Sequence, residues 1–326
     1  MSVSESTTEQ LSQNQAMHAL RAHERGGPDQ LVYELAPRPP IGLGDALVRV
    51  HAASFTPTEM AWPPTWEDRA GRDRRPIIPA HEVAGTVVAL GFGTTGVAVG
   101  AAVYALTDWY RDGAAAEYIA VEVRDLALMP TTLSFVEAAT VPLAGLTAWQ
   151  ALFDHGALSA GQTVLIHGAG GGVGVFAVQL AHAAGARVVA TGRAWSRQLV
   201  TELGADEFID LNGRPFESVV SAVDLAVDLV GGNILKRTWA VVKMGGVLVS
   251  AVADPAITQP ETHHGHSVYF VVTPDRAELV ALAQRIEAGE LRPIVGGVTP
   301  LAEGRAAFEA KLSGGVPGKM ALRVAN

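Results

Sequence analysis

A glycine cluster between residues 168 and 174 is the part of this sequence whose residue types and spacing best suit a chemical role. A short apolar, β-branched segment (163–166) precedes it, an amphipathic helical pattern follows it, and residues 186–191 supply a second strand-like segment. In such a strand–turn–helix unit, glycines allow a sharp turn close to a pyrophosphate, and N–H groups at the helix start hold its charge. We therefore predict a dinucleotide-binding βαβ unit rather than a turn used only for packing. The turn residues expected to contact the cofactor are Gly168, Gly171, Gly172, Val173 and Gly174.

The end of the second strand indicates which dinucleotide is bound. A carboxylate there would accept a hydrogen bond from the ribose 2′-OH of NAD, whereas an arginine accommodates the 2′-phosphate of NADP. This strand ends at Thr191, Gly192 and Arg193, and Arg197 lies one helical step further on, with no Asp or Glu at the decisive place. We expect NADPH as the cofactor, with Thr191, Arg193 and Arg197 beside it. The alternative is that both arginines are solvated residues at a helix end.

The histidines and carboxylates do not define a metal site. The chain has no cysteine, which excludes thiolate ligands. His51, Glu59 and His81 are ligand types that could hold zinc, but nothing in their spacing brings them together. The histidines over residues 263–266 lack a fourth ligand, and we expect them in a polar loop. We predict no metal.

Composition and patterning predict a globular α/β protein with two domains. The 326 residues are too many for one small core, and 48% hydrophobic with 17% charged residues is typical of a globular chain. The net charge of −9 argues against general attraction to nucleic acid or anionic membranes. Alternating short strands run to about residue 132, and a capping-box pattern at Ser134 and Glu137 then begins a region of alternating strands and helices, typical of a doubly wound parallel sheet.

The N-terminal residues show no targeting pattern. Residues 1–16 are polar, with neither the basic nor the apolar region of a signal peptide, so we expect a poorly ordered tail. No segment has the apolar length of a membrane span. We expect a cytoplasmic protein.

Several motifs together resemble the medium-chain dehydrogenase/reductase superfamily, and specifically its zinc-free, NADPH-dependent quinone oxidoreductase branch. Besides the glycine turn, they are Gly26-Gly27-Pro28, Val48-Arg49-Val50-His51-Ala52-Ala53, Pro79-Ala80-His81-Glu82-Val83-Ala84-Gly85, residues 137–149, Gly204-Ala205-Asp206, Asp228-Leu229-Val230-Gly231-Gly232 and Gly318-Lys319. The resemblance implies a GroES-like β-rich catalytic domain (17–132 and 273–326), a Rossmann NADPH-binding domain (133–272), an active site between them, and a homodimer. It also implies further cofactor contacts at Thr147, Gly231, Ala251, Val252, Phe270, Val271 and Lys319.

The chemistry that the resemblance implies is hydride transfer from NADPH to a quinone or α,β-unsaturated carbonyl. Many relatives have Asn-Pro-x-Asp where this chain has Thr56-Pro57-Thr58-Glu59, so the Thr56 hydroxyl is the candidate for contacting substrate or nicotinamide. Trp109 and Tyr110 lie in a loop that could form a wall of the substrate pocket. Tyr110 and Tyr269 are further candidate catalytic residues, and each of these aromatic residues could equally serve packing. Two alternatives stay open: an NADPH-binding redox sensor or structural partner with little catalysis, and an alcohol dehydrogenase-like enzyme.

Overall fold

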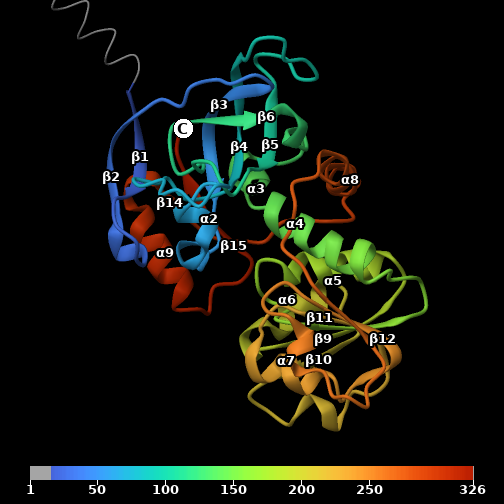
Figure 1. The fold of residues 1–326 in the computed structure, drawn as a ribbon. Coiled ribbons are helices and arrows are strands. Elements are labelled where there is room, and N and C mark those ends of the chain that lie inside the picture. Colours follow the sequence, from blue (N-terminus) through green and yellow to red (C-terminus); the bar gives the residue numbers. More distant parts are fainter. Residues whose placement is uncertain (1–15, 326) are drawn as a thin grey trace, which may run out of the picture.

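Two β-sheets organise the chain, and the structure, a computed structural model, describes residues 16–325 (Figure 1). The strands of the upper body in Figure 1 are β1 (Ala16–Ala22), β2 (Leu31–Pro37), β3 (Asp45–Ser54), β4 (Glu82–Leu90), β5 (Ala102–Leu106), β6 (Tyr118–Glu122), β7 (Ala127–Leu128), β14 (Val295–Pro300) and β15 (Lys319–Arg323). Its main sheet has seven strands in the order β14-β15-β3-β4-β5-β7, with β6 also pairing with β3, while β1 and β2 form a separate hairpin. Because β15 pairs with β3, the C-terminal segment completes a sheet that the N-terminal part begins.

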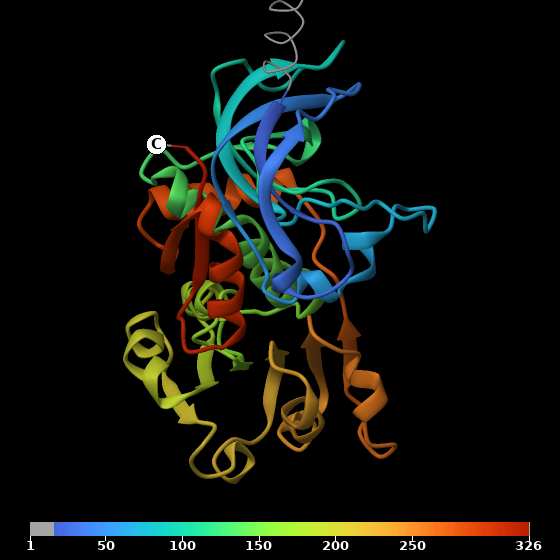
Figure 2. The same cartoon turned by 90° about the vertical axis from the view of Figure 1, so that its left-hand side faces the viewer.

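The lower body contains a six-stranded parallel sheet, seen from a second side in Figure 2. Its strands are β8 (Thr163–His167), β9 (Arg187–Gly192), β10 (Glu207–Asp210), β11 (Val223–Asp228), β12 (Val242–Ser250) and β13 (His266–Tyr269). They lie in the order β10-β9-β8-β11-β12-β13, and every neighbouring pair is parallel. This is the doubly wound order in which a ligand lies beyond the carboxyl ends of the strands, where the winding reverses between β8 and β11.

Helices connect these strands and join the two bodies. They are α2 (Pro63–Trp66), α3 (Phe135–Ala139), α4 (Pro142–Trp149), α5 (Gly174–Ala183), α6 (Arg197–Glu202), α7 (Gly232–Thr238), α8 (Arg276–Glu287) and α9 (Gly304–Leu312). The capping box expected at Ser134 and Glu137 is present and begins α3. The Tyr104 hydroxyl of β5 donates to the Leu279 carbonyl of α8 at 2.5 Å, so α8 is fixed to the upper body. Among residues 16–325, no helix combines the length and the apolar character that crossing a bilayer requires.

Alternating residues of the parallel strands enter two different cores. In β8, Val164 and Ile166 belong to the core beneath α4 and α5, whereas Leu165 belongs to the core on the other face. β9 and β11 show the same alternation. A strand that is buried on both faces needs apolar side chains on both, which explains why these strands are continuous apolar runs in the sequence.

The expected fold class is confirmed: a mixed-sheet GroES-like body and a parallel-sheet Rossmann body. The expectation of a polar loop for the histidines of 263–266 is wrong at its end, because His266 begins β13 beside β12. A four-residue edge strand with mostly polar side chains gives little apolar alternation to detect. Of the predicted N-terminal tail, Ala16 lies in β1 and the rest falls outside the described residues.

Candidate active site

The glycine turn connects β8 to α5 at the carboxyl edge of the parallel sheet. Gly168 has φ +77°, and its N–H and that of Ala169 donate to the Thr191 carbonyl at 3.1 and 3.0 Å. A Cβ on Gly174 would lie 2.3 Å from the Gly168 carbonyl oxygen, so only glycine lets the helix start this close to the strand. Val175 and Ala177 of α5 donate their N–H groups to the Gly171 and Val173 carbonyls, so an anion here would be received by N–H groups of the turn before them, at the positive end of the helix dipole.

The C-terminal segment lies against this turn. The Gly318 N–H donates to the Gly170 carbonyl at 3.1 Å, and a Cβ on Gly172 would lie 2.7 Å from the Lys319 side chain. Gly171 forms an isolated parallel bridge with Gly318. Residues about 150 positions apart in the sequence therefore form one side of the site together.

The end of β9 holds the residues predicted to select the cofactor. Thr191 is buried and its hydroxyl lies 2.8 Å from the Nδ1 of His167, so its side chain is directed into the sheet. Arg193 is exposed, and its guanidinium lies near Gly314 in the loop before β15. Arg197 instead donates to the Phe208 carbonyl at 3.2 Å and covers the ring of that residue at 4.8 Å. Of the two predicted arginines, Arg193 is the one directed towards the C-terminal segment, whereas Arg197 is used by β10.

The ends of β11 and β12 form a second group. The buried carboxylate of Asp228 accepts hydrogen bonds from the Gly231 N–H, at 3.0 and 3.1 Å to its two oxygens, and from the Ser250 hydroxyl at 3.1 Å. Burial raises the pKa of Asp228, although the hydrogen bonds oppose that shift. Gly231 has φ +76°, and a Cβ there would lie 2.9 Å from Val252. The structure thus brings together two predicted cofactor residues, Gly231 and Val252, with Ala251 half-buried between the strand end and Val252.

Of the predicted residues at the end of β13 and just after it, one is buried in the core and two are exposed. Phe270 is buried against the ring of His155, with ring centres 4.6 Å apart, and only its backbone is available to a ligand. Val271 and Tyr269 are exposed, at 61% and 48% of their surfaces. Among residues 16–325, the Tyr269 side chain forms no hydrogen bond or ring contact with another predicted site residue.

A buried ion pair joins the upper body to this site. The Lys319 ammonium forms an ion pair with Glu82 and donates to the Phe55 carbonyl at 2.8 Å. The other Glu82 oxygen accepts the Leu143 N–H of α4 at 3.0 Å. Thr147, one turn further along α4, is buried and donates its hydroxyl to the Leu143 carbonyl at 2.6 Å. Sequence reasoning placed Lys319 near the cofactor but missed its partner Glu82.

Thr56 lies at the end of this buried network. It is half-buried, and its N–H donates to Glu59 at 3.1 Å, while the Ala80 N–H donates to the other Glu59 oxygen at 2.5 Å. Burial raises the pKa of Glu59 to about 7, against the opposing effects of those N–H groups and of Lys319. Glu59 thus fixes the backbone of Thr56 and the preceding part of the loop at the end of this network.

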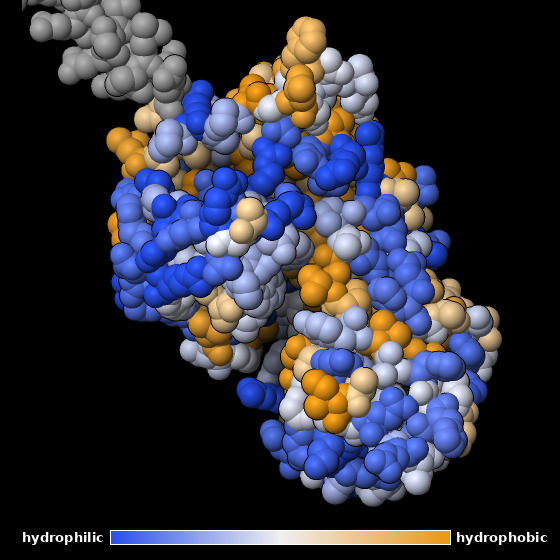
Figure 3. Space-filling view, in the orientation of Figure 1, coloured by the Kyte–Doolittle hydropathy of each residue, from blue (hydrophilic) through white to orange (hydrophobic). Residues whose placement is uncertain are grey.

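Of the two predicted wall residues, Trp109 and Tyr110, Trp109 is the one that connects the two bodies. The Trp109 indole N–H donates to the Val272 carbonyl at 3.4 Å, and its ring packs against His81 and Trp62, with centres 4.9 and 5.3 Å apart. Tyr110 instead lies under the Arg69 guanidinium at 4.7 Å. Figure 3 shows the surface hollowed between the upper and lower bodies.

The candidate metal ligands do not converge. Among residues 16–325, no group of three or more His, Cys, Asp or Glu side chains is placed to hold a metal ion. His51 stacks on Phe135 at 4.1 Å, and burial lowers the pKa of His81 to about 3. His263 uses both ring nitrogens, for the Val242 carbonyl and for the Gly265 N–H. These residues do not fit a catalytic zinc site, which needs three converging ligands.

Comparisons with known proteins agree with this geometry. Residues 42–131 match the family described as alcohol dehydrogenase GroES-like domain, and residues 203–322 match the family described as zinc-binding dehydrogenase. The chain is 32% identical to a probable zinc-binding oxidoreductase, mitochondrial, of Arthroderma benhamiae over 88% of this chain and 91% of that protein. It is 35% identical to the 2-methylene-furan-3-one reductase of Solanum lycopersicum, over 79% of this chain and 65% of that protein.

A solved structure shows the same arrangement over nearly the whole length. The quinone oxidoreductase of Coxiella burnetii superposes with a TM-score of 0.88 at 26% identity, covering 95% of this chain and 99% of that one. The chain belongs to the medium-chain dehydrogenase/reductase superfamily, in its quinone oxidoreductase-like branch.

Proposed function

We propose that this chain is a zinc-independent oxidoreductase that transfers hydride from NADPH to a quinone or an α,β-unsaturated carbonyl. The observation that carries the proposal is the composition of the site between the bodies. The glycine turn and Arg193 lie on one side of the site. The other side offers hydroxyl and backbone groups and the buried Lys319–Glu82 ion pair. Among the described residues, no set of metal ligands converges there. Relatives described as an NADPH-dependent alkenal/one oxidoreductase and a quinone oxidoreductase, at 34% and 28% identity, support the substrate class.

Different segments of the chain would bind different parts of NADPH. The start of α5 would hold the pyrophosphate, Arg193 the 2′-phosphate, and Gly231 with Val252 would close over the ribose and nicotinamide. NADPH, when bound, supplies the hydride from its nicotinamide. On the side of the Lys319–Glu82 ion pair, Thr147 and Thr56 would face the nicotinamide, and the Thr56 hydroxyl would donate a hydrogen bond to a substrate oxygen that gains negative charge. In a conjugated acceptor that charge is delocalised, so neutral donors can suffice.

The remaining assignments accompany this proposal. Tyr110 and Tyr269 are retained as lower-ranked candidates beside Thr56, because both are accessible, but Trp109 is the better placed wall of the pocket. We also propose a cytoplasmic homodimer, to be checked by light scattering of the purified chain. The proposed domain division is 17–132 with 273–326, and 133–272.

The test is a set of initial rates of NADPH and NADH oxidation with a panel of quinones and enones, with and without EDTA. We expect turnover that favours NADPH and resists EDTA. Arg193→Gln should raise the KM for NADPH about tenfold or more and leave that for NADH nearly unchanged, because a charge-assisted contact is lost. Arg187→Gln is the matched control, since Arg187 is an exposed arginine at the start of β9, the strand that Arg193 follows, and is already paired with Glu207.

Three results would contradict parts of the proposal. Preference for NADH would refute the proposed role of Arg193 but would be consistent with the proposed reductase activity. Activity lost with EDTA would refute the metal-free site. NADPH binding without turnover of any acceptor would favour a nucleotide-binding sensor.

A further inference from the structure

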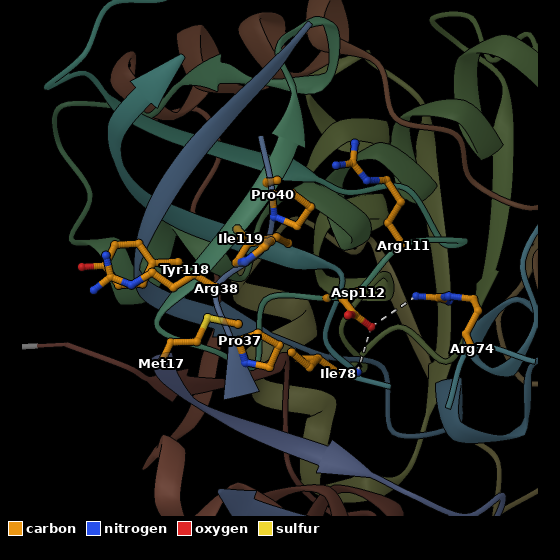
Figure 4. Close-up of a pocket in the computed structure, with 13 residues that line it drawn as sticks. Met17, Pro37, Arg38, Pro40, Arg74, Ile78, Arg111, Asp112, Tyr118 and Ile119 are labelled. Carbon is orange, nitrogen blue, oxygen red and sulfur yellow. Dashed lines mark hydrogen bonds and ion pairs between the residues drawn. The ribbon is translucent and has the colours of Figure 1, made fainter. Parts of the chain in front are cut away.

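A second pocket lies on the upper body, among β1, β2, β6 and the loops that carry Arg74 and Arg111 (Figure 4). Its volume is about 420 Å³, within the range of small-molecule sites. None of its lining residues belongs to the glycine turn or to the parallel sheet. The mechanism proposed above makes no use of it.

Arg38 brings to this pocket a positive charge that no described residue neutralises. Its guanidinium lies 4.0 Å from the centre of the Tyr118 ring, face-on as a cation–π contact. Its Nε is buried and has no hydrogen-bond partner within residues 16–325, and no carboxylate in that part of the chain forms an ion pair with it. A guanidinium that no carboxylate of the described residues pairs with can form an ion pair with an anionic ligand.

The other two arginines of the pocket are already engaged and form fixed walls. Arg111 makes a bidentate ion pair with Asp45, at 2.9 and 2.8 Å, and the Asp45 pKa is lowered chiefly by that hydrogen bonding. Arg74 donates to the Pro64 carbonyl at 2.7 Å and lies 3.4 Å from Asp112. The dashed lines in Figure 4 show Asp112 also accepting the N–H of Ile78, at 3.2 Å.

The charge balance of the pocket therefore differs from that of the whole chain. Asp112 is the one acidic residue among the lining residues, against three arginines. Even with Asp45 counted against Arg111, one positive charge, that of Arg38, remains in a chain whose net charge is −9. The pocket therefore has a local excess of positive charge in a protein whose net charge is negative.

The rest of the lining is apolar and stiff. Met17, Ile78 and Ile119 line it, and the segment 37–40 adds three prolines whose backbone is already restricted. Such walls suit a flat hydrocarbon body better than a hydrated inorganic ion.

We propose that this pocket is a second ligand site for a small organic anion. A single carboxylate or phosphate would accept hydrogen bonds from Arg38, and an apolar, planar body would lie against the prolines and Ile119. The planar fork of a guanidinium matches both anionic groups.

Isothermal titration of the full chain with three probes tests the proposal: 2-naphthoate, 2-naphthyl phosphate, and neutral 2-naphthalenemethanol. We expect saturable binding of at least one anion, with the neutral probe at least about tenfold weaker. The ratio between the two anions then distinguishes a carboxylate ligand from a phosphate ligand. Equal binding of the neutral probe, or no saturable binding of either anion, would overturn the proposal.

Variants locate the binding. Arg38→Gln should weaken anion binding about tenfold or more, whereas Arg187→Gln, which removes an exposed arginine of the lower body, should not change it. Pro40→Trp keeps Arg38 and fills part of the cavity, so it should also weaken binding. The melting temperature of each variant checks that it folds. If Arg38→Gln and Pro40→Trp both bind the anion as the unchanged chain does, the probe occupies another place and the proposal fails.

Discussion

Replacing Lys319 by methionine should destabilise the protein strongly, because it leaves the buried carboxylate of Glu82 without its positively charged partner. The side chains of Lys319 and Glu82 are 6% and 0% exposed, and their ion pair is the charge contact that joins the C-terminal segment to β4. Methionine is about as long as lysine and fills the same space, but among residues 16–325 it leaves the Glu82 carboxylate with the Leu143 N–H as its one hydrogen-bond donor.

The expected loss is about 3–5 kcal/mol in the free energy of unfolding, the range found when one partner of a buried ion pair is removed. The double variant Lys319→Met with Glu82→Gln contains no buried charge at this place, and its glutamine can still accept the Leu143 N–H. It should therefore be more stable than Lys319→Met alone, by about 2 kcal/mol.

Urea unfolding followed by circular dichroism measures these differences, with Lys243→Met as the matched control. Lys243 is also paired with an aspartate, Asp224, but its side chain is 44% exposed, so its loss should cost less than about 1 kcal/mol. The reasoning is refuted if Lys319→Met costs no more than Lys243→Met, or if adding Glu82→Gln makes the Lys319 variant less stable still.

Three further predictions concern the turn, a buried acid and the aromatic wall. Gly174→Ala should weaken NADPH binding at least about tenfold in a titration, because its Cβ would meet the Gly168 carbonyl at 2.3 Å, and an unchanged Kd would contradict the described turn. Burial raises the pKa of Glu59 from 4.5 to about 7, so the folded chain retains a proton that the unfolded chain has released, and stability falls by about 3 kcal/mol as the pH rises through that window. Glu59→Gln should remove this difference between urea unfolding at pH 5 and pH 8, and a variant with the full pH dependence would show that another group causes it. Trp109→Ala should raise the KM for the acceptor several-fold, by about 1 kcal/mol, with little change for NADPH, while Trp109→Phe keeps most of the contact; equal effects on both KM values would place Trp109 outside the substrate pocket.

The features that the sequence predicts correctly are those in which neighbours along the chain determine the geometry. The capping box at Ser134 needs Glu137 three residues later, and both are visible in the sequence. The turn from Gly168 to Gly174 is similarly local, and the structure confirms that the chain folds there from strand to helix. The strand and helix order of the lower body follows from the alternation of such local signals.

The features that sequence reasoning missed depend on contacts between distant segments. Nothing near Glu82 indicates that its partner is Lys319, since 237 positions separate them and glutamate at the start of a strand has many other uses. Arg197 lies one helical step from Arg193 and has the same charge, yet it is bound to Phe208 of β10, which sequence spacing could not show. The choice between Trp109 and Tyr110 likewise depended on which ring meets Val272.

Lys319 connects segments of the proposed site that lie far apart in the sequence. Its backbone follows Gly318, which is bonded to the glycine turn, while its side chain reaches Glu82 and Phe55 of the upper body. Glu82 in turn binds the start of α4, the helix that carries Thr147. The start of β15 therefore connects the glycine turn, the start of β4 and α4, three parts of the proposed site that come from distant segments. Because a 1 Å misplacement can cost a catalyst about a hundredfold in rate, we expect loss of this connection to lower the activity as well as the stability.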